Sequence, residues 1–357
     1  MQTKIRRIIL CLCWILSHAI FAQNTFSLKN ERINIKPIGY HIAGIIDARS
    51  QKQIIGNIIT ANETRESITL EGGIRNNIQN FISKNLPKDN YSVPVLYRIT
   101  TLTTAETKQS NGQISGKMSL VVSFEKIGKN DTTALVSSNV YTNYNRTGGT
   151  PNLNNYEAVL RPLIIQTLKY FDDWMEINNE KHEAFAKGIK IDFLPDFNIN
   201  DEDTIYYETR KINWDDFRAK PTSLSRYGAS IFTNFGYSSS FRVTKGLIRA
   251  VIQTKTYMVR GMSWVFPTAQ NDYALAHEQL HFDITKLVVE RFKKKIALMQ
   301  AETIDDINSM IQYEYLESYK EMNRLQKEYD GETQHSLDRA KQAEWAQKIR
   351  TWLEENT

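Results

Sequence analysis

The stretch 271–292, NDYALAHEQLHFDITKLVVERF, constrains this chain more than any other. It contains His277, Glu278 and His281 in the pattern HExxH. Because an α-helix turns by about 100° per residue, histidines at positions i and i+4 project from the same face. The apolar residues also recur at helical spacing, and most charged residues lie off that stripe, so we expect a helix with one buried face. The apolar positions are Leu280, Ile284, Leu287, Val288 and Phe292, and the charged positions off the stripe include Lys286 and Glu290.

The HExxH pattern is typical of the zincins, a class of zinc hydrolases. Two imidazoles hold Zn²⁺ there, and the glutamate accepts a proton from the water on the metal. In this chain His277 and His281 are the predicted ligands and Glu278 is the predicted general base.

A catalytic zinc needs a third protein ligand beside an open position. His335 is the only histidine after the motif, and it falls between two predicted helices, 302–328 and 336–353. We therefore take His335 as the preferred third ligand. Glu332 and Asp330, in the same segment, remain the carboxylate alternatives.

A different metal site is also conceivable, because residues 278–281 and 332–335 both read ExxH. Two such motifs occur in di-iron carboxylate four-helix bundles. That scheme needs a further glutamate from each of two more helices, whereas only three helices are predicted after Asp203, and it leaves His277 unused. The zinc site is therefore the favoured interpretation.

The first 22 residues have the pattern of a secretory signal peptide. A basic start is followed by an apolar run from Ile8 to Ile20 and by Ala22, a small residue suited to cleavage. The run is too short for a stable membrane anchor. Both cysteines, Cys11 and Cys13, lie inside this segment, so we expect an exported protein, periplasmic or extracellular, without disulfides or thiolate ligands.

Charge gives no support for a nucleic-acid partner. The formal net charge is +5, and three of the positive charges belong to the predicted leader. No stripe of Lys and Arg interleaved with aromatic residues remains.

The remaining chain is predicted to be an α+β protein of two domains. Residues 23–177 are expected to form an antiparallel sheet with two helices, near 68–86 and 156–177. This domain carries no catalytic pattern, so we interpret it as a binding or docking module whose partner is unknown. The polar segment 178–204 is predicted to be a linker, and 205–357 a zincin-like domain with a short sheet, from strands near 229–237 and 246–259, and three long helices.

Several spaced motifs occur in order in 205–353: Trp214, Asp215, Asp216 and Phe217 with Pro221; Ser263, Trp264 and Val265; HEQLHFDI from His277; and YDGETQH from Tyr329 with Gln342 and Trp345. This series resembles the DUF922 family of predicted secreted zinc-dependent proteases. The resemblance implies an exported metallopeptidase acting on peptide or protein substrates. Asp283, two residues past His281, points about 200° away from it on a helix, so we expect a hydrogen bond that supports a metal ligand or anchors the helix, and no metal contact. Ser336 departs from the pattern, in which glycine is expected. Tyr315 and Tyr329 are candidate oxyanion donors, although we expect them to have core or surface roles.

The sequence thus favours a secreted zinc metallopeptidase. The alternative is a non-catalytic binding or assembly protein of the cell envelope, in which any metal is structural or vestigial. A structural zinc takes four protein ligands and leaves no open position, so the geometry of the site discriminates the two.

Overall fold

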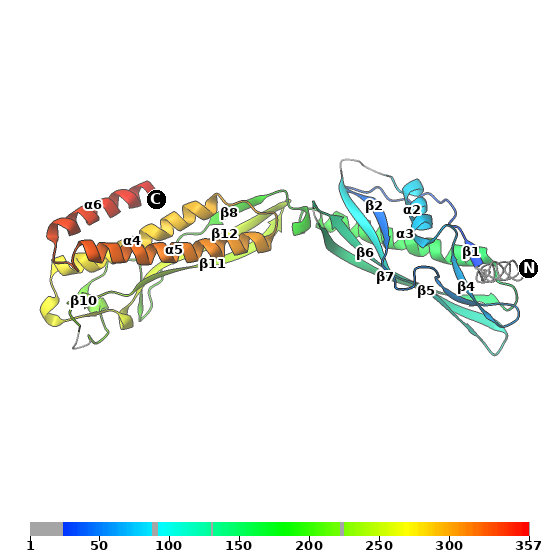
Figure 1. Cartoon of the computed structure of the whole chain (residues 1–357), viewed down its shortest axis with the longest axis horizontal. Helices are drawn as coiled ribbons and strands as arrows, with labels where there is room; N and C mark the ends of the chain where they lie inside the picture. The colour runs from blue at the N-terminus through cyan, green and yellow to red at the C-terminus, as the bar shows by residue number, and fades with distance from the viewer. Residues whose placement is uncertain (1–23, 88–91, 130, 222–224, 357) are drawn as a thin grey trace, which may run out of the picture. The chain divides into compact units, whose positions relative to one another are not determined.

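A computed structural model of the chain describes residues 24–87, 92–129, 131–221 and 225–356. The predicted leader, 1–22, lies outside the described residues. The chain divides into two compact units, with the boundary between Asn179 and Glu180. Both units combine sheet and helices, which confirms the α+β class (Figure 1). Among the described residues, no helix has the length and apolar character that crossing a membrane requires.

In its described residues, the first unit is a seven-stranded sheet with two helices. The strands run in the order β1-β4-β3-β5-β6-β7, and β2 also pairs with β5. Its elements are β1 (Asn24–Phe26), β2 (Tyr40–Asp47), β3 (Gly56–Ile59), β4 (Arg65–Leu70), α2 (Ile74–Asn85), β5 (Val93–Lys108), β6 (Gln113–Ile127), β7 (Thr132–Thr147) and α3 (Leu153–Asn178).

This sheet is mixed, so the prediction of an antiparallel sheet was wrong in part. The pairs β5/β6, β6/β7 and β3/β4 are antiparallel, whereas β1/β4, β2/β5 and β3/β5 are parallel. Alternating apolar residues indicate which face of a strand is buried, but they carry no information on the direction of its neighbour. Parallel pairs need long crossover connections, and α2 lies in the connection between β2 and β5.

The two helices of the first unit cover its apolar core. Helix α3 buries Leu160, Leu168 and Phe171, and the Phe171 ring stacks on Phe124 of β6 at a centroid distance of 4.1 Å. Phe124 in turn meets Tyr97 of β5 edge to face at 5.5 Å. Such contacts join the helix to the long central strands.

A buried carboxylate lies in the same unit. Glu106 of β5 has no exposed side-chain surface and pairs with Arg146 of β7 at 2.7 Å. Its oxygens also accept hydrogen bonds from the hydroxyls of Tyr144 and Tyr156 and from the amide of Ile59. The charge is therefore fully partnered, which is the condition under which a buried ion pair is tolerated.

Most of the segment predicted to be a linker, 178–204, belongs to the second unit, which begins at Glu180. Within it β8 (Ile189–Phe193) pairs in parallel with the strand β12 (Leu247–Val259). Its abundance of Asn, Asp, Glu and Lys suggested a linker, but β8 pairs through its backbone, which composition does not report.

The second unit contains a four-stranded sheet, a two-stranded sheet and three long helices, as predicted for the helices. β11 (Thr233–Thr244) and β12 form a hairpin, and β9 (Thr204–Tyr206) adds to β12. β10 (Ala229–Ser230) pairs with β13 (Trp264–Val265). The helices are α4 (Asp272–Ala297), α5 (Ile304–Glu332) and α6 (Arg339–Asn356), and short 3₁₀ turns are η1 (Glu183–Phe185), η2 (Trp214–Asp216), η3 (Arg260–Met262) and η4 (Pro267–Ala269).

Helix α4 is the centre of this unit and packs against α5, α6 and the sheet (Figure 1). All five apolar residues predicted to face the core are buried. Lys286 and Glu290, predicted to lie off the apolar stripe, are buried as well, because Lys286 pairs with Glu290 at 2.8 Å and with Asp196 at 2.5 Å. A helix enclosed on several sides keeps its side chains fixed, which suits a site that needs defined geometry.

Candidate metal centre

The two motif histidines lie near the start of α4, on a buried face. The side chain of Asn271 accepts a hydrogen bond from the amide of Ala274 at 2.9 Å, which caps the helix. The rings of His277 and His281 have centroids 5.1 Å apart, and both residues are buried. The predicted helical placement of the pair is confirmed.

Asp330, near the end of α5, brings a carboxylate oxygen to both histidines. Its Oδ1 lies 3.3 Å from Nε2 of His277 and 2.9 Å from Nε2 of His281. The ligand atoms of the three residues all lie within 4.8 Å of one another. Two imidazole nitrogens and a carboxylate oxygen at this separation could hold one metal ion.

The charges of this group support one another. Burial alone would raise the pKa of Asp330, but hydrogen bonds and charge from His277 and His281 outweigh it and hold that pKa well below its usual value. Burial would lower the pKa of His281, yet its hydrogen bond to Asp330 and the nearby Glu278 raise it overall. The surroundings therefore favour the ionised form of Asp330 and the protonated form of His281.

Tyr329 fixes the orientation of His277. Its hydroxyl lies 2.8 Å from Nδ1 of His277, and the two rings stack with centroids 4.7 Å apart. This contact occupies Nδ1 and leaves Nε2 to face Asp330. Outer partners of this kind set the tautomer and ring position of metal-binding histidines.

Glu278 is held beside the histidines by the backbone. Its Oε2 accepts a hydrogen bond from the amide of Ile231, between β10 and β11, at 2.9 Å. Burial raises the pKa of Glu278, and the neighbouring histidines oppose that effect. A buried carboxylate with a raised pKa is better suited to accept a proton than one in open water.

The other two residues predicted as third ligands, Glu332 and His335, are not members of this group. Glu332 accepts a hydrogen bond from the indole of Trp345 at 2.9 Å. His335 is half exposed, and its Nδ1 lies 3.7 Å from Oδ1 of Asp330, beyond hydrogen-bond distance. The structure thus brings Asp330, rather than the preferred His335, to the histidine pair.

Asp283 ties α4 to Tyr207, which follows β9. It accepts hydrogen bonds from the hydroxyl of Tyr207 at 3.0 Å and from the side chain of Gln279 at 2.7 Å. It points away from the metal group, which agrees with its position two residues after His281 on the helix.

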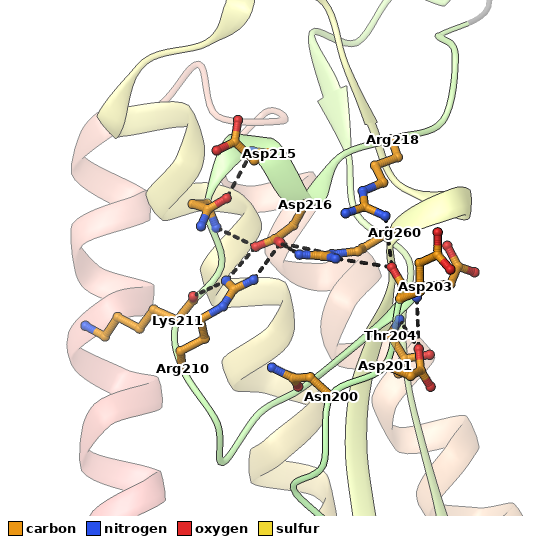
Figure 2. Close-up of polar contacts among 12 residues, drawn as sticks. Asn200, Asp201, Asp203, Thr204, Arg210, Lys211, Asp215, Asp216, Arg218 and Arg260 are labelled. Carbon is orange, nitrogen blue, oxygen red and sulfur yellow. Dashed lines mark hydrogen bonds and ion pairs between the residues drawn. The ribbon is translucent and has the colours of Figure 1, made fainter.

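Arg210, Asp216 and Arg260 form the centre of a polar layer in the second unit (Figure 2). Asp216 is fully buried and accepts hydrogen bonds from Arg210 and Arg260, both at 2.7 Å. Beyond Arg260, the hydroxyl of Ser263 accepts a hydrogen bond from the amide of Phe232, the neighbour of Ile231, at 2.9 Å. The layer therefore positions the amide that holds Glu278.

Sequence reasoning missed the roles of Tyr329 and Ile231. Tyr329 adjoins Asp330, which is the signal that could have identified it. Ile231 acts through its amide, so its side chain gives no signal.

No family model, curated protein or solved structure matches this chain. The functional interpretation accordingly rests on the geometry of the site and on the sequence motifs.

Proposed function

We propose that the second unit is a zinc-dependent peptidase. The observation that carries this proposal is the convergence of Nε2 of His277, Nε2 of His281 and Oδ1 of Asp330 beside the buried Glu278. Two imidazoles, one carboxylate and an adjacent glutamate are the donor set of a catalytic zinc site. We expect His277, His281 and Asp330 to hold the ion.

Zinc bound there would polarise the scissile carbonyl and lower the pKa of water. Glu278 takes a proton from the water that attacks the carbonyl carbon, and it passes that proton to the nitrogen of the departing amine. The amide of Ile231 holds one oxygen of Glu278, which limits rotation of the carboxylate and leaves Oε1 for the proton. Tyr329 keeps His277 in the ligating orientation.

The number of protein ligands supports catalysis over a structural metal. Among the described residues, this group of His and Asp side chains has three members, whereas a structural zinc takes four. The resemblance to the DUF922 family and the predicted leader support the same proposal, namely an exported enzyme acting on peptides or proteins.

The test compares the purified wild type with Glu278→Gln for zinc content and for hydrolysis of a mixed peptide library. We expect about one zinc per chain in both proteins, with turnover reduced by about 10²-fold or more in the variant. A wild type without zinc, or a variant that hydrolyses peptides as fast as the wild type, contradicts the proposal.

A matched control is Glu328→Gln, which removes a carboxylate from α5 close to the site. Glu328 is exposed and pairs with Arg324 on the surface. Both zinc content and turnover should stay at the wild-type level. A loss equal to that of Glu278→Gln would show that the effect is not specific to the general base.

A further inference from the structure

The turn that follows α5 has an unusual backbone. Gln334, His335 and Ser336 have φ angles of 49°, 52° and 68°. Non-glycine residues rarely adopt positive φ, and three in succession persist only where the surroundings enforce them. Such conformations cluster at functional sites.

Hydrogen bonds enforce this turn from both sides. The amide of His335 donates to the carbonyl of Asp330 at 2.9 Å, and the amide of Asp338 donates to the carbonyl of Thr333 at 2.9 Å. The Thr333 hydroxyl is also bonded to the carbonyl of Tyr329 at 2.7 Å. The same short segment therefore fixes Tyr329, Asp330 and His335 relative to one another.

The turn places a third imidazole at the edge of the metal group. The side chain of His335 is 45% exposed, compared with 7% for His277 and 10% for His281. Its ring packs against that of Tyr227, which precedes β10, with centroids 4.4 Å apart. His335 can therefore meet a substrate from solvent, which the two buried histidines cannot do.

The distance to Asp330 leaves the His335 ring available for another partner. Its Nδ1 lies 3.7 Å from the Asp330 carboxylate, which is beyond hydrogen-bond distance. The ring thus packs against Tyr227, and at this distance Asp330 does not accept a hydrogen bond from it. Among the described histidines, this combination of exposure and closeness to Asp330 belongs to His335.

We propose that His335 donates a hydrogen bond to the scissile carbonyl oxygen as that oxygen gains negative charge. This inference rests on the proposed peptidase function and deepens it, because it adds a substrate-contacting residue from the turn after α5. Donors placed where charge develops in the transition state contribute more to turnover than to substrate binding. His335 is then a catalytic residue and not a zinc ligand.

The experiment measures kcat, KM, zinc content and the thermal midpoint of the metal-free protein for His335→Ala. We expect kcat to fall by about 10²–10³-fold, as for loss of one transition-state donor, with KM nearly unchanged. Zinc content and the midpoint should match the wild type. A phosphinic peptide, which mimics the charged tetrahedral oxygen, should bind more weakly to the variant, while a product peptide should bind equally.

Two further variants separate the imidazole from the backbone. His335→Asn retains an N–H donor and tolerates positive φ, so it should recover part of the lost kcat. Ser336→Gly relieves the adjacent strained position and keeps the imidazole, so its kcat should equal that of the wild type.

The outcomes are distinguishable. Loss of zinc in His335→Ala would make His335 a ligand and overturn the inference. An unchanged kcat would also overturn it, while peptidase activity of the wild type would leave the proposed function standing. A lower midpoint of the metal-free protein, matched by an equal loss in His335→Asn, would assign His335 a structural role. A wild type with neither zinc nor activity removes both proposals.

Discussion

Replacing Asp216 by Asn should weaken the second unit in a way that depends on pH. Asp216 is fully buried, and its two oxygens accept hydrogen bonds from Arg210, Arg260 and the amide of Asn213 (Figure 2). Asparagine keeps the shape but offers one acceptor oxygen, and it carries no charge to oppose the two guanidinium groups.

The magnitude follows from the pKa of Asp216. Burial alone would raise it, but hydrogen bonds from Arg210, Asn213 and Arg260 lower it from 3.8 to about 2. Since one pKa unit corresponds to about 1.4 kcal/mol, the ionised form adds about 2 kcal/mol to the free energy of unfolding. Breaking a buried ion pair costs about 3–5 kcal/mol. Arg210 is 35% exposed and Arg260 is 15% exposed, so we expect the lower end, about 3 kcal/mol at neutral pH.

The sign of the pH dependence is fixed by the lowered pKa. The stabilisation is present above the unfolded-state pKa of 3.8, and it is lost as pH falls through the folded-state pKa of about 2. The assay is urea unfolding of wild type and Asp216→Asn, followed by tryptophan fluorescence. The difference in free energy between the two should shrink by about 2 kcal/mol between about pH 4 and about pH 2.

Asp215→Asn is the matched control, because Asp215 is the exposed neighbour in the same turn. It should change the free energy of unfolding by less than about 0.5 kcal/mol at every pH. A difference between wild type and Asp216→Asn that stays constant down to about pH 2, or grows, would refute the reasoning, since neither fits a carboxylate with a lowered pKa.

Three other expectations concern single contacts. Tyr329→Phe removes the hydroxyl beside Nδ1 of His277 and should weaken zinc affinity by about 10–100-fold in a competitive chelator titration; unchanged affinity would contradict the orienting role. Ser263→Ala leaves the amide of Phe232 without its buried acceptor, so urea unfolding should show a loss of about 1–3 kcal/mol. Glu106→Gln leaves Arg146 without its charged partner and should destabilise the first unit by about 3–5 kcal/mol, whereas an unchanged unfolding midpoint would show that the pair contributes little.

The motif helix was predictable from sequence because two independent patterns agree there. The apolar spacing indicates a helix, and the same helix places His277 and His281 on one face. The strand β8, within the predicted linker 178–204, was not predictable in the same way. β8 is identified by backbone pairing with β12, and its polar composition favours an irregular segment.

The prediction of the third metal ligand depended on where helix α5 ends. Our prediction ended that helix at 328 and treated 329–335 as a loop, from which any of three side chains could reach the motif. In the structure α5 continues through Gly331 to Glu332. On a regular helix Glu332 points about 200° away from Asp330, so a carboxylate at 330 that faces α4 excludes one at 332. Glu332 accordingly meets Trp345.

The WDDF segment, 214–217, and the SWV segment, 263–265, help to position the proposed general base, Glu278. Helix α4 alone places Glu278 next to the histidines, but a single carboxylate on a helix can rotate about its side-chain bonds. The amide of Ile231 restricts that rotation, and its position depends on the bond from Phe232 to Ser263. Ser263 follows Arg260, which is tied to Asp216. A chain with an intact HExxH helix but without this layer would therefore hold Glu278 less firmly, which is a physical reason for the WDDF and SWV segments to accompany the helix.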